Sequence, residues 1–201
     1  MKALARFLTL FLFTIPSLTA QDGTPRFQVF AGYSFLDNVP GNPTFNGWDI
    51  NASWNLKRYS GAAGNFVRYF SLSAEFSGVY GPYTYIVPGS ASSSPQGWPL
   101  ITKNVGYYRY FLGQRFTFSE HKYEPFIQTQ VGVSDWRIPT GSRASFTMGF
   151  GGGLDIVLSK HFAYRVFQAD YTNVVREPPH RWWDSQIELR TGVVFRFGKS
   201  M

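Results

Sequence analysis

The histidines and the residues around one of them are the natural starting point for catalytic chemistry. His180 lies close in sequence to Glu177, Asp184 and Ser185, a set that could supply a base, an acid and a nucleophile. Nucleophilic catalysis needs the base within hydrogen-bond reach of the nucleophile, and closeness in sequence does not provide that geometry. We therefore expect no catalytic residues and no enzymatic activity.

Metal and cofactor chemistry have equally little support in the sequence. His121 and His161 lie far from His180, and the chain has no cysteine, so no metal-ligand spacing is visible. The glycine-rich run 149–153 is not followed by the Lys-Ser/Thr of a phosphate-binding loop, and it lies within a predicted strand. Glycines there favour close packing instead. We expect no metal and no cofactor.

Charged residues recur at alternate positions of apolar segments, which places them on one face of a strand. A charge enclosed in a small interior must be paired, because an unpaired buried charge is very unfavourable. We therefore predict a salt-bridge and hydrogen-bond network with a structural role. Its predicted members are Asp49, Glu75, Arg109, Arg115, Glu124, Asp155, Arg165, Glu188, Arg190 and Arg196.

The elements that carry these charges show a period of two residues, which predicts strands with one apolar and one polar face. The predicted strands are 26–36, 47–57, 69–80, 105–118, 123–136, 144–158, 162–172 and 185–197. In 162–172, Arg165 and Asp170 would fall on opposite faces of a straight strand, so we expect a bulge near Val166–Phe167. The number of strands is even, as single-chain outer-membrane barrels require.

The predicted connections differ in length at the two ends of the strands. Segments 119–122 and 159–161 are tight polar turns, whereas 37–46, 81–104, 137–143 and 173–184 are longer. This asymmetry is typical of membrane barrels, with short inner turns and long outer loops. The connection 58–68 does not follow the pattern, because it is long but lies on the inner side.

Composition favours a membrane barrel over a soluble one. Aromatic residues make up 19% of the chain and charged residues 15%, whereas soluble domains carry about 25% charged residues. Alternation alone also fits a soluble lipocalin-like barrel. Lysines and arginines are scattered despite the net charge of +7, so nucleic-acid binding is not expected. Aromatic residues near strand ends predict two interfacial girdles: Trp48, Tyr59, Tyr69, Tyr80, Tyr107, Tyr108, Tyr123, Trp136, Tyr171, Trp182 and Trp183.

The first residues have the features of a secretory leader. Lys2 and Arg6 precede an apolar core at 7–15, and Pro16 and Thr19-Ala20 follow it. The apolar core is shorter than the roughly 20 residues that a membrane helix needs. We expect a cleaved signal peptide at 1–20 and one barrel domain at 21–201.

The last predicted strand ends in Arg190-Thr191-Gly192-Val193-Val194-Phe195-Arg196-Phe197. This segment looks like the terminal-strand signal read by the barrel-assembly machinery, with Gly192, Phe195 and Phe197 at its fixed positions. Four further residues follow Phe197, whereas the signal usually ends at its last aromatic residue.

With segments 149–155 and 164–171, this terminal strand resembles the family of small outer-membrane barrels related to the membrane domain of outer-membrane protein A. The resemblance covers about residues 26–198. It implies an all-β, eight-stranded antiparallel up-and-down transmembrane barrel in the outer membrane of a Gram-negative cell. Outer-membrane lipids, lipopolysaccharide and, during insertion, the barrel-assembly machinery are the implied partners. We expect a stand-alone barrel without the peptidoglycan-binding domain of larger relatives.

An eight-stranded interior holds side chains and no aqueous channel, so we expect a plugged lumen and a structural or surface-binding role. One outer loop mixes cations with aromatic residues, which could meet lipid phosphates or a partner. Its candidate contact residues are Arg176, His180, Arg181, Trp182 and Trp183. The alternatives are a lipopolysaccharide-modifying barrel enzyme, a narrow channel and a soluble lipocalin-like ligand-binding barrel.

Overall fold

The computed structural model describes residues 25–38, 44–58, 68–86, 100–118, 121–138, 141–175 and 183–198. They form eight strands: β1 (Phe27–Asn38), β2 (Phe45–Arg58), β3 (Tyr69–Ile86), β4 (Leu100–Thr117), β5 (Tyr123–Ile138), β6 (Gly141–Val157), β7 (Phe162–Val175) and β8 (Trp183–Phe197). Among these residues no helix is long and apolar enough to cross a membrane.

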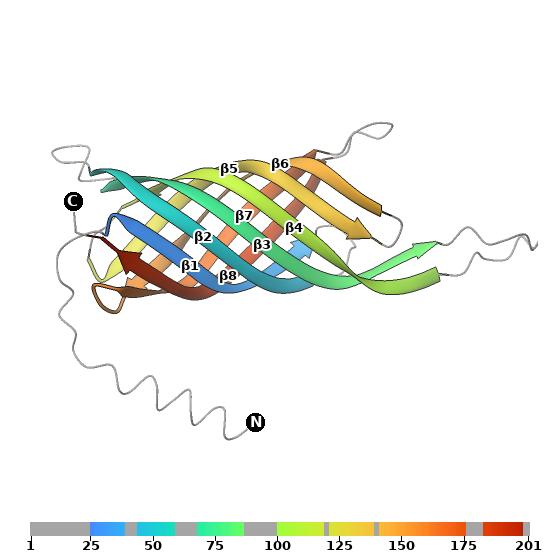
Figure 1. Ribbon diagram of the computed structural model, residues 1–201, viewed down its shortest axis with the longest axis horizontal. Coiled ribbons are helices and arrows are strands. Elements are labelled where there is room, and N and C mark those ends of the chain that lie inside the picture. Colours follow the sequence, from blue (N-terminus) through green and yellow to red (C-terminus); the bar gives the residue numbers. More distant parts are fainter. Residues whose placement is uncertain are drawn as a thin grey trace, which may run out of the picture.

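The strands close into a single antiparallel barrel in which each strand pairs with its neighbours in sequence (Figure 1). β1 also pairs with β8, from Phe27 opposite Phe197 to Asn38 opposite Gln186, which closes the sheet. Closure leaves the wall without a free strand edge, the condition for a sheet placed in hydrocarbon. The predicted fold class, an eight-stranded up-and-down barrel, is confirmed.

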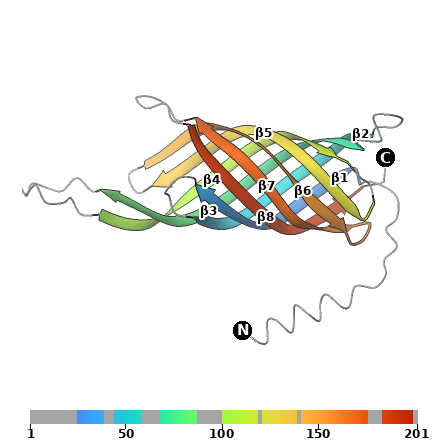
Figure 2. The same ribbon diagram turned by 180° about the vertical axis from the view of Figure 1, so that it is seen from behind.

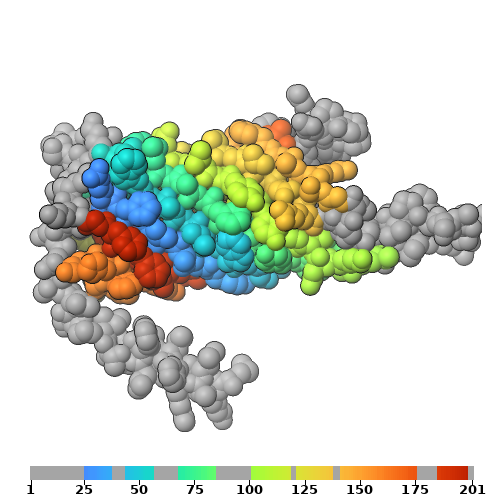
Figure 3. Space-filling model, in the orientation of Figure 1, coloured from blue at the N-terminus to red at the C-terminus, as the bar shows by residue number. Residues whose placement is uncertain are grey.

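The barrel has two distinguishable ends. β1 begins and β8 ends at one of them, which we call the terminal end, and we call the other the far end (Figure 2). The strands cross the wall as slanted bands in the space-filling view (Figure 3). Strand tilt of this kind accompanies barrel closure.

β3 and β4 extend past the far end as a two-stranded ribbon (Figure 1). Their pairing reaches Ile86 opposite Leu100, whereas β2 pairs with β3 only as far as Tyr80. The prediction of a loop over 81–104 was therefore wrong at both of its ends. Pro82 is compatible with the ribbon because no second described strand pairs with β3 there, so the missing N–H breaks no ladder on that side.

The bulge expected near Val166–Phe167 is present in β7. Both residues stand opposite Thr191 alone, because the β7–β8 register shifts between Arg165 and Gln168. The extra residue turns Arg165 and Asp170 to the same, inner face, where each is 1% exposed. A second register shift, at Leu56 of β2, has no signal in the sequence, since the alternation continues through it.

Along the middle of the wall, most polar side chains point inward and most apolar side chains point outward. On β5, Gln128 and Gln130 are buried, whereas their neighbours Ile127 and Val131 are 51% and 53% exposed. A soluble barrel has the opposite arrangement, with apolar residues inside. The inverted arrangement is the one that hydrocarbon outside and polar groups inside require.

Candidate functional site: the barrel interior and its rims

The interior holds every member of the predicted charge network. All ten predicted residues are buried in the barrel. They fall into a central layer around Arg190 and a second layer toward the terminal end around Asp155, and an apolar cluster lies toward the far end.

Arg190 on β8 is the hub of the central layer. Its Nη1 and Nη2 each donate to one oxygen of Glu75 at 2.6 Å, a bidentate contact across the barrel. Nη1 lies 3.1 Å from Asp170 Oδ2, and Nε lies 3.7 Å from Asp49 Oδ2. Nη2 also donates to Glu188. One guanidinium thus contacts carboxylates from β2, β3, β7 and β8, and links strands on opposite sides of the barrel.

Arg109 on β4 completes this layer. It donates to Glu188 and, at 3.0 Å, to Ser77 Oγ. Ser34 Oγ also donates to Glu188, so that carboxylate receives bonds from three strands. The guanidinium lies 5.7 Å from the centre of the Tyr107 ring, a cation–π contact.

The central layer contains four carboxylates and two guanidinium groups. Asp49 is the least engaged carboxylate, because neither of its oxygens accepts a hydrogen bond from the residues that the structure describes. Its attraction to Arg190 at 3.7 Å is therefore weaker than the bidentate bond of Glu75.

The second layer lies nearer the terminal end. Asp155 on β6 accepts from Arg115 at 2.7 Å and from Arg165 at 2.8 and 3.1 Å. Arg196 donates to Glu124 at 3.0 Å. Phe126 lies beneath the Arg115 guanidinium, 3.6 Å from ring centre to Cζ. Every arginine predicted for the network has a carboxylate partner.

Gln168 joins the two layers. It accepts from Arg165 Nη1 at 2.6 Å and donates to Asp170 Oδ2 at 2.5 Å. Gln128 donates to the other oxygen of Asp170 at 3.2 Å. The sequence prediction missed Asp170 and Gln168, although the expected bulge placed ahead of them would have turned both to the inner face.

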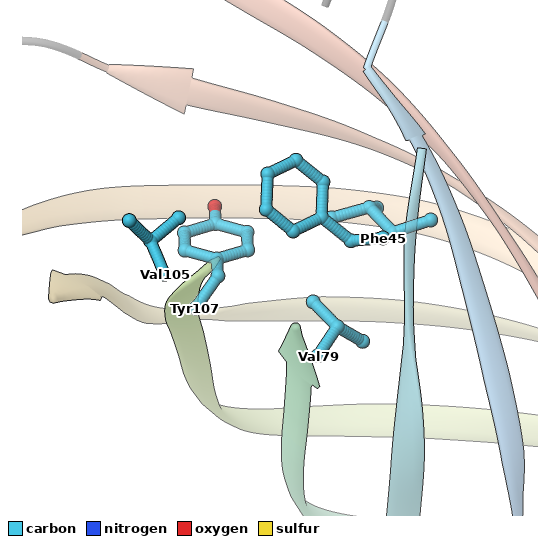
Figure 4. Close-up of a cluster of buried hydrophobic side chains, with 5 residues drawn as sticks. Phe45, Val79, Val105 and Tyr107 are labelled. Carbon is cyan, nitrogen blue, oxygen red and sulfur yellow. The ribbon is translucent and has the colours of Figure 1, made fainter. Parts of the chain in front are cut away.

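An apolar cluster fills the interior toward the far end. Phe45, Val79, Val105 and Tyr107 come together from β2, β3 and β4 (Figure 4), and Leu36 belongs to the same cluster. Tyr107 OH donates to Gln186 Oε1 at 3.3 Å, so the hydroxyl group has a buried polar partner. A smaller cluster of Phe30, Ala163 and Val194 lies at the terminal end.

The predicted aromatic girdles were partly wrong. Tyr69 and Tyr107 are buried, and Trp136 packs on the apolar cluster, with its ring 4.8 Å from that of Tyr107. Tyr107 and Tyr108 are adjacent in a strand, so only one of them can point outward. Closeness to a strand end does not say which way a side chain points. The phase of the alternation decides that.

The outward members form a girdle at the far end. Tyr108 OH lies 3.1 Å from Tyr80 OH, and the Arg137 guanidinium lies 4.6 Å from the centre of the Tyr108 ring. Trp48 packs edge-on against Phe76 at 4.9 Å. Tyr123 is 54% exposed at the terminal end, and Tyr171 lies on the wall. Tyr59 and Trp182 lie outside the described residues.

The residues of the proposed assembly signal close the barrel. A methyl group added at Gly192 would lie 2.4 Å from the carbonyl oxygen of Ala31 on β1, so the two strands approach closely there. Phe195 packs against Phe162 at 5.5 Å and Phe197 against Phe27 at 6.5 Å, on the outer wall. Gly192 and Phe197 thus contact the first strand, whereas Phe195 contacts β7.

The candidate contact residues Arg176, His180, Arg181 and Trp182 lie outside the described residues, and Trp183 is the first residue of β8. The leader at 1–20 also lies outside them. Ser185, the nucleophile of the catalytic alternative, exchanges hydrogen bonds with Tyr171 and Asn173 at 2.6 and 3.1 Å. Within the described segments no cluster of three His, Cys, Asp or Glu could hold a metal ion.

A solved structure shares this architecture, and two others were found by the same comparison. Neisserial surface protein A aligns with a TM-score of 0.52 at 10% identity, over 88% of this chain and 100% of that one. The attachment invasion locus protein Ail of Yersinia pestis, in complex with sucrose octasulfate, gives 0.46 at 14% identity, over 88% and 100%. The N-terminal barrel of Pseudomonas aeruginosa OprF gives 0.47 at 11% identity, over 87% and 99%.

The sequence alone does not lead to these proteins. No protein-family model matches the chain, and no curated protein matches it. Strand number, topology and closure carry the similarity. The chain has the fold of the small eight-stranded outer-membrane β-barrels.

Proposed function

We propose that this protein is a structural barrel of the outer membrane whose lumen is plugged and whose far end faces the cell exterior. The observation that carries the proposal is the inverted wall: large apolar side chains exposed outside and paired charges inside. Lipids and lipopolysaccharide would contact that wall. No catalytic step is part of the proposal.

The plugged lumen is supported by what fills it. The central layer connects opposite walls through Arg190, and the apolar cluster of Phe45, Val79 and Tyr107 stands between that layer and the far end. An open water path would have to pass both. Eight-stranded interiors have just enough room for side chains.

A surface-binding role is the second candidate, favoured by the β3–β4 ribbon. Among the described residues, 81–86 and 100–105 pair only with each other, so within that part of the chain the ribbon presents a free strand edge on both sides. Free edges are sites at which an extended segment of a partner can add a strand. We also propose that residues 1–20 are a cleaved leader and that Gly192, Phe195 and Phe197 are read by the barrel-assembly machinery.

The experiment combines refolding into lipid vesicles with conductance in planar bilayers. We expect gel mobility that changes on heating, the behaviour of a closed barrel, together with no large steady current. Stable currents of the size of a general porin would contradict the plugged lumen. A protein that stays in the soluble fraction and does not insert would contradict the membrane assignment.

A further inference from the structure

Two polar side chains interrupt the apolar outer wall between its rims. Gln114 on β4 and Thr129 on β5 are cross-strand partners, and both are exposed. Thr129 lies midway between Tyr123, near one rim, and Asp135, near the other. The Gln114–Thr129 pair therefore lies in the middle of the apolar band, where neither water nor a headgroup can satisfy it.

Two other sets of polar side chains on this wall are satisfied within the chain. Tyr164 OH bonds to Thr191 at 2.9 Å. Tyr171 OH lies 2.6 Å from Ser185 Oγ, which bonds to Asn173 at 3.1 Å. The Gln114–Thr129 pair differs from these two sets, because neither of its side chains has a hydrogen bond to a residue in the described part of the chain.

The pair lies in a groove on the outer wall across β4, β5 and β6. The groove is also lined by Leu112, Val131, Met148, Phe150 and Asn173. Leu112 and Phe150 are 67% and 61% exposed, the highest values among the large apolar side chains of the described wall. The surface therefore offers a hollow with polar atoms in it and two projecting apolar side chains beside it.

We propose that this groove is a self-association surface on which a second copy of the chain docks within the bilayer. In a two-fold dimer the same patch serves both partners, so the projecting side chains of one copy can fill the hollow of the other. A glutamine amide both donates and accepts, so two copies of Gln114 can satisfy each other. A lipid chain would fill the hollow and leave the amide unsatisfied, which favours protein as the occupant.

The inference rests on the proposed membrane placement, and the absence of cysteine makes a direct test available. Thr129→Cys places a single thiol in the groove. Ala31→Cys places a single thiol at an exposed position of β1, four strands away from β5 around the closed barrel. In vesicles diluted with excess lipid, we expect Thr129→Cys to give a disulfide-linked dimer in several-fold higher yield. Equal yields from the two variants would overturn the proposal.

A second variant tests the polar contact. Gln114→Leu should weaken dimerisation by roughly 3- to 30-fold, which corresponds to measured polar contacts between membrane segments. Energy transfer between labelled copies in vesicles would measure it. Leu189→Ala, at an exposed apolar site on β8 outside the groove, should leave the dimer unchanged.

Heat-dependent gel mobility distinguishes a failure of the dimer proposal from a failure of the proposed membrane placement. A wild-type protein that inserts and folds but stays monomeric overturns the dimer and leaves the proposed function intact. A protein that does not insert overturns both. If Gln114→Leu does not fold, the yields of the two cysteine variants still decide the matter.

Discussion

The inner and outer faces of the same strands meet opposite environments. On the inner face of β8, Glu188 and Arg190 find their partners inside the barrel, within one network. On the outer face of the same strand, Ile187 and Leu189 are 42% and 47% exposed and need no polar partner. The comparison shows that one residue step along a strand changes the required chemistry, because the solvent outside is hydrocarbon and the interior must satisfy itself.

Replacing Arg190, the hub of the inner network, should destabilise the barrel most. Arg190→Met leaves Glu75, Asp170 and Asp49 enclosed without their shared cation. Removing one partner of a buried ion pair costs about 3–5 kcal/mol, and we expect the free energy of unfolding to fall by that amount. Urea unfolding in lipid vesicles measures it. Arg143→Met, at an exposed rim position, is the control, and equal losses would contradict a buried hub.

The outer face should respond most strongly in its middle. Val131→Arg puts a charge at a position on the outer wall where the native side chain is 53% exposed. We expect a loss of about 2–4 kcal/mol, the range for arginine at the bilayer midplane, against about 0–1 kcal/mol for Ser142→Arg near the far rim. The same unfolding experiment measures both. If the two variants lose the same free energy, depth in the membrane does not control the outer face.

Asp49→Asn tests whether the carboxylates of the network contribute unequally to stability. Asp49 accepts no hydrogen bond from the described residues, and it adds a carboxylate to a layer that already has more acid than base. We expect its replacement to change the free energy of unfolding by less than about 1 kcal/mol, within the net value of one hydrogen bond. Glu75→Gln, which breaks a bidentate contact, should cost clearly more. The reverse order would contradict the assignment of Glu75 as the principal partner.

The smallest effect is expected at the far rim. Arg137 is 59% exposed, and it stacks on Tyr108 and pairs with Asp135 at 3.2 Å. Exposed pairs contribute about 0–1 kcal/mol, so Arg137→Ala should change the free energy of unfolding by less than that. A loss close to that of Arg190→Met would show that the rim stabilises the barrel as much as the interior does.

The alternation predicted the fold well, because a period of two is imposed by every residue of a strand. It located all eight strands and the ten charges, and it located the bulge because Arg165 and Asp170 were out of phase. It did not give the β3–β4 ribbon, because residues 81–86 are paired by the geometry of their own hairpin and carry no alternation.

The site was less predictable for a different reason. Partners such as Arg190 and Glu75 are 115 positions apart in sequence, and only the register around a closed barrel brings them together. Tyr107 of the apolar cluster was wrongly predicted to lie in a girdle, since a tyrosine near a strand end suits both environments. The Gln114–Thr129 pair had no signal at all, since an exposed glutamine is unusual only once its face is known to meet lipid.

Which face of the wall meets the acyl chains can be measured directly. Cysteines placed singly at 50–54 of β2 and carrying a spin label would report contact with oxygen, which concentrates in hydrocarbon, and with a water-soluble relaxation agent. We expect high oxygen contact at Ile50, Ala52 and Trp54 and low contact at Asn51 and Ser53, in vesicles containing the folded protein. The opposite phase, or no alternation, would contradict an outer wall that faces lipid.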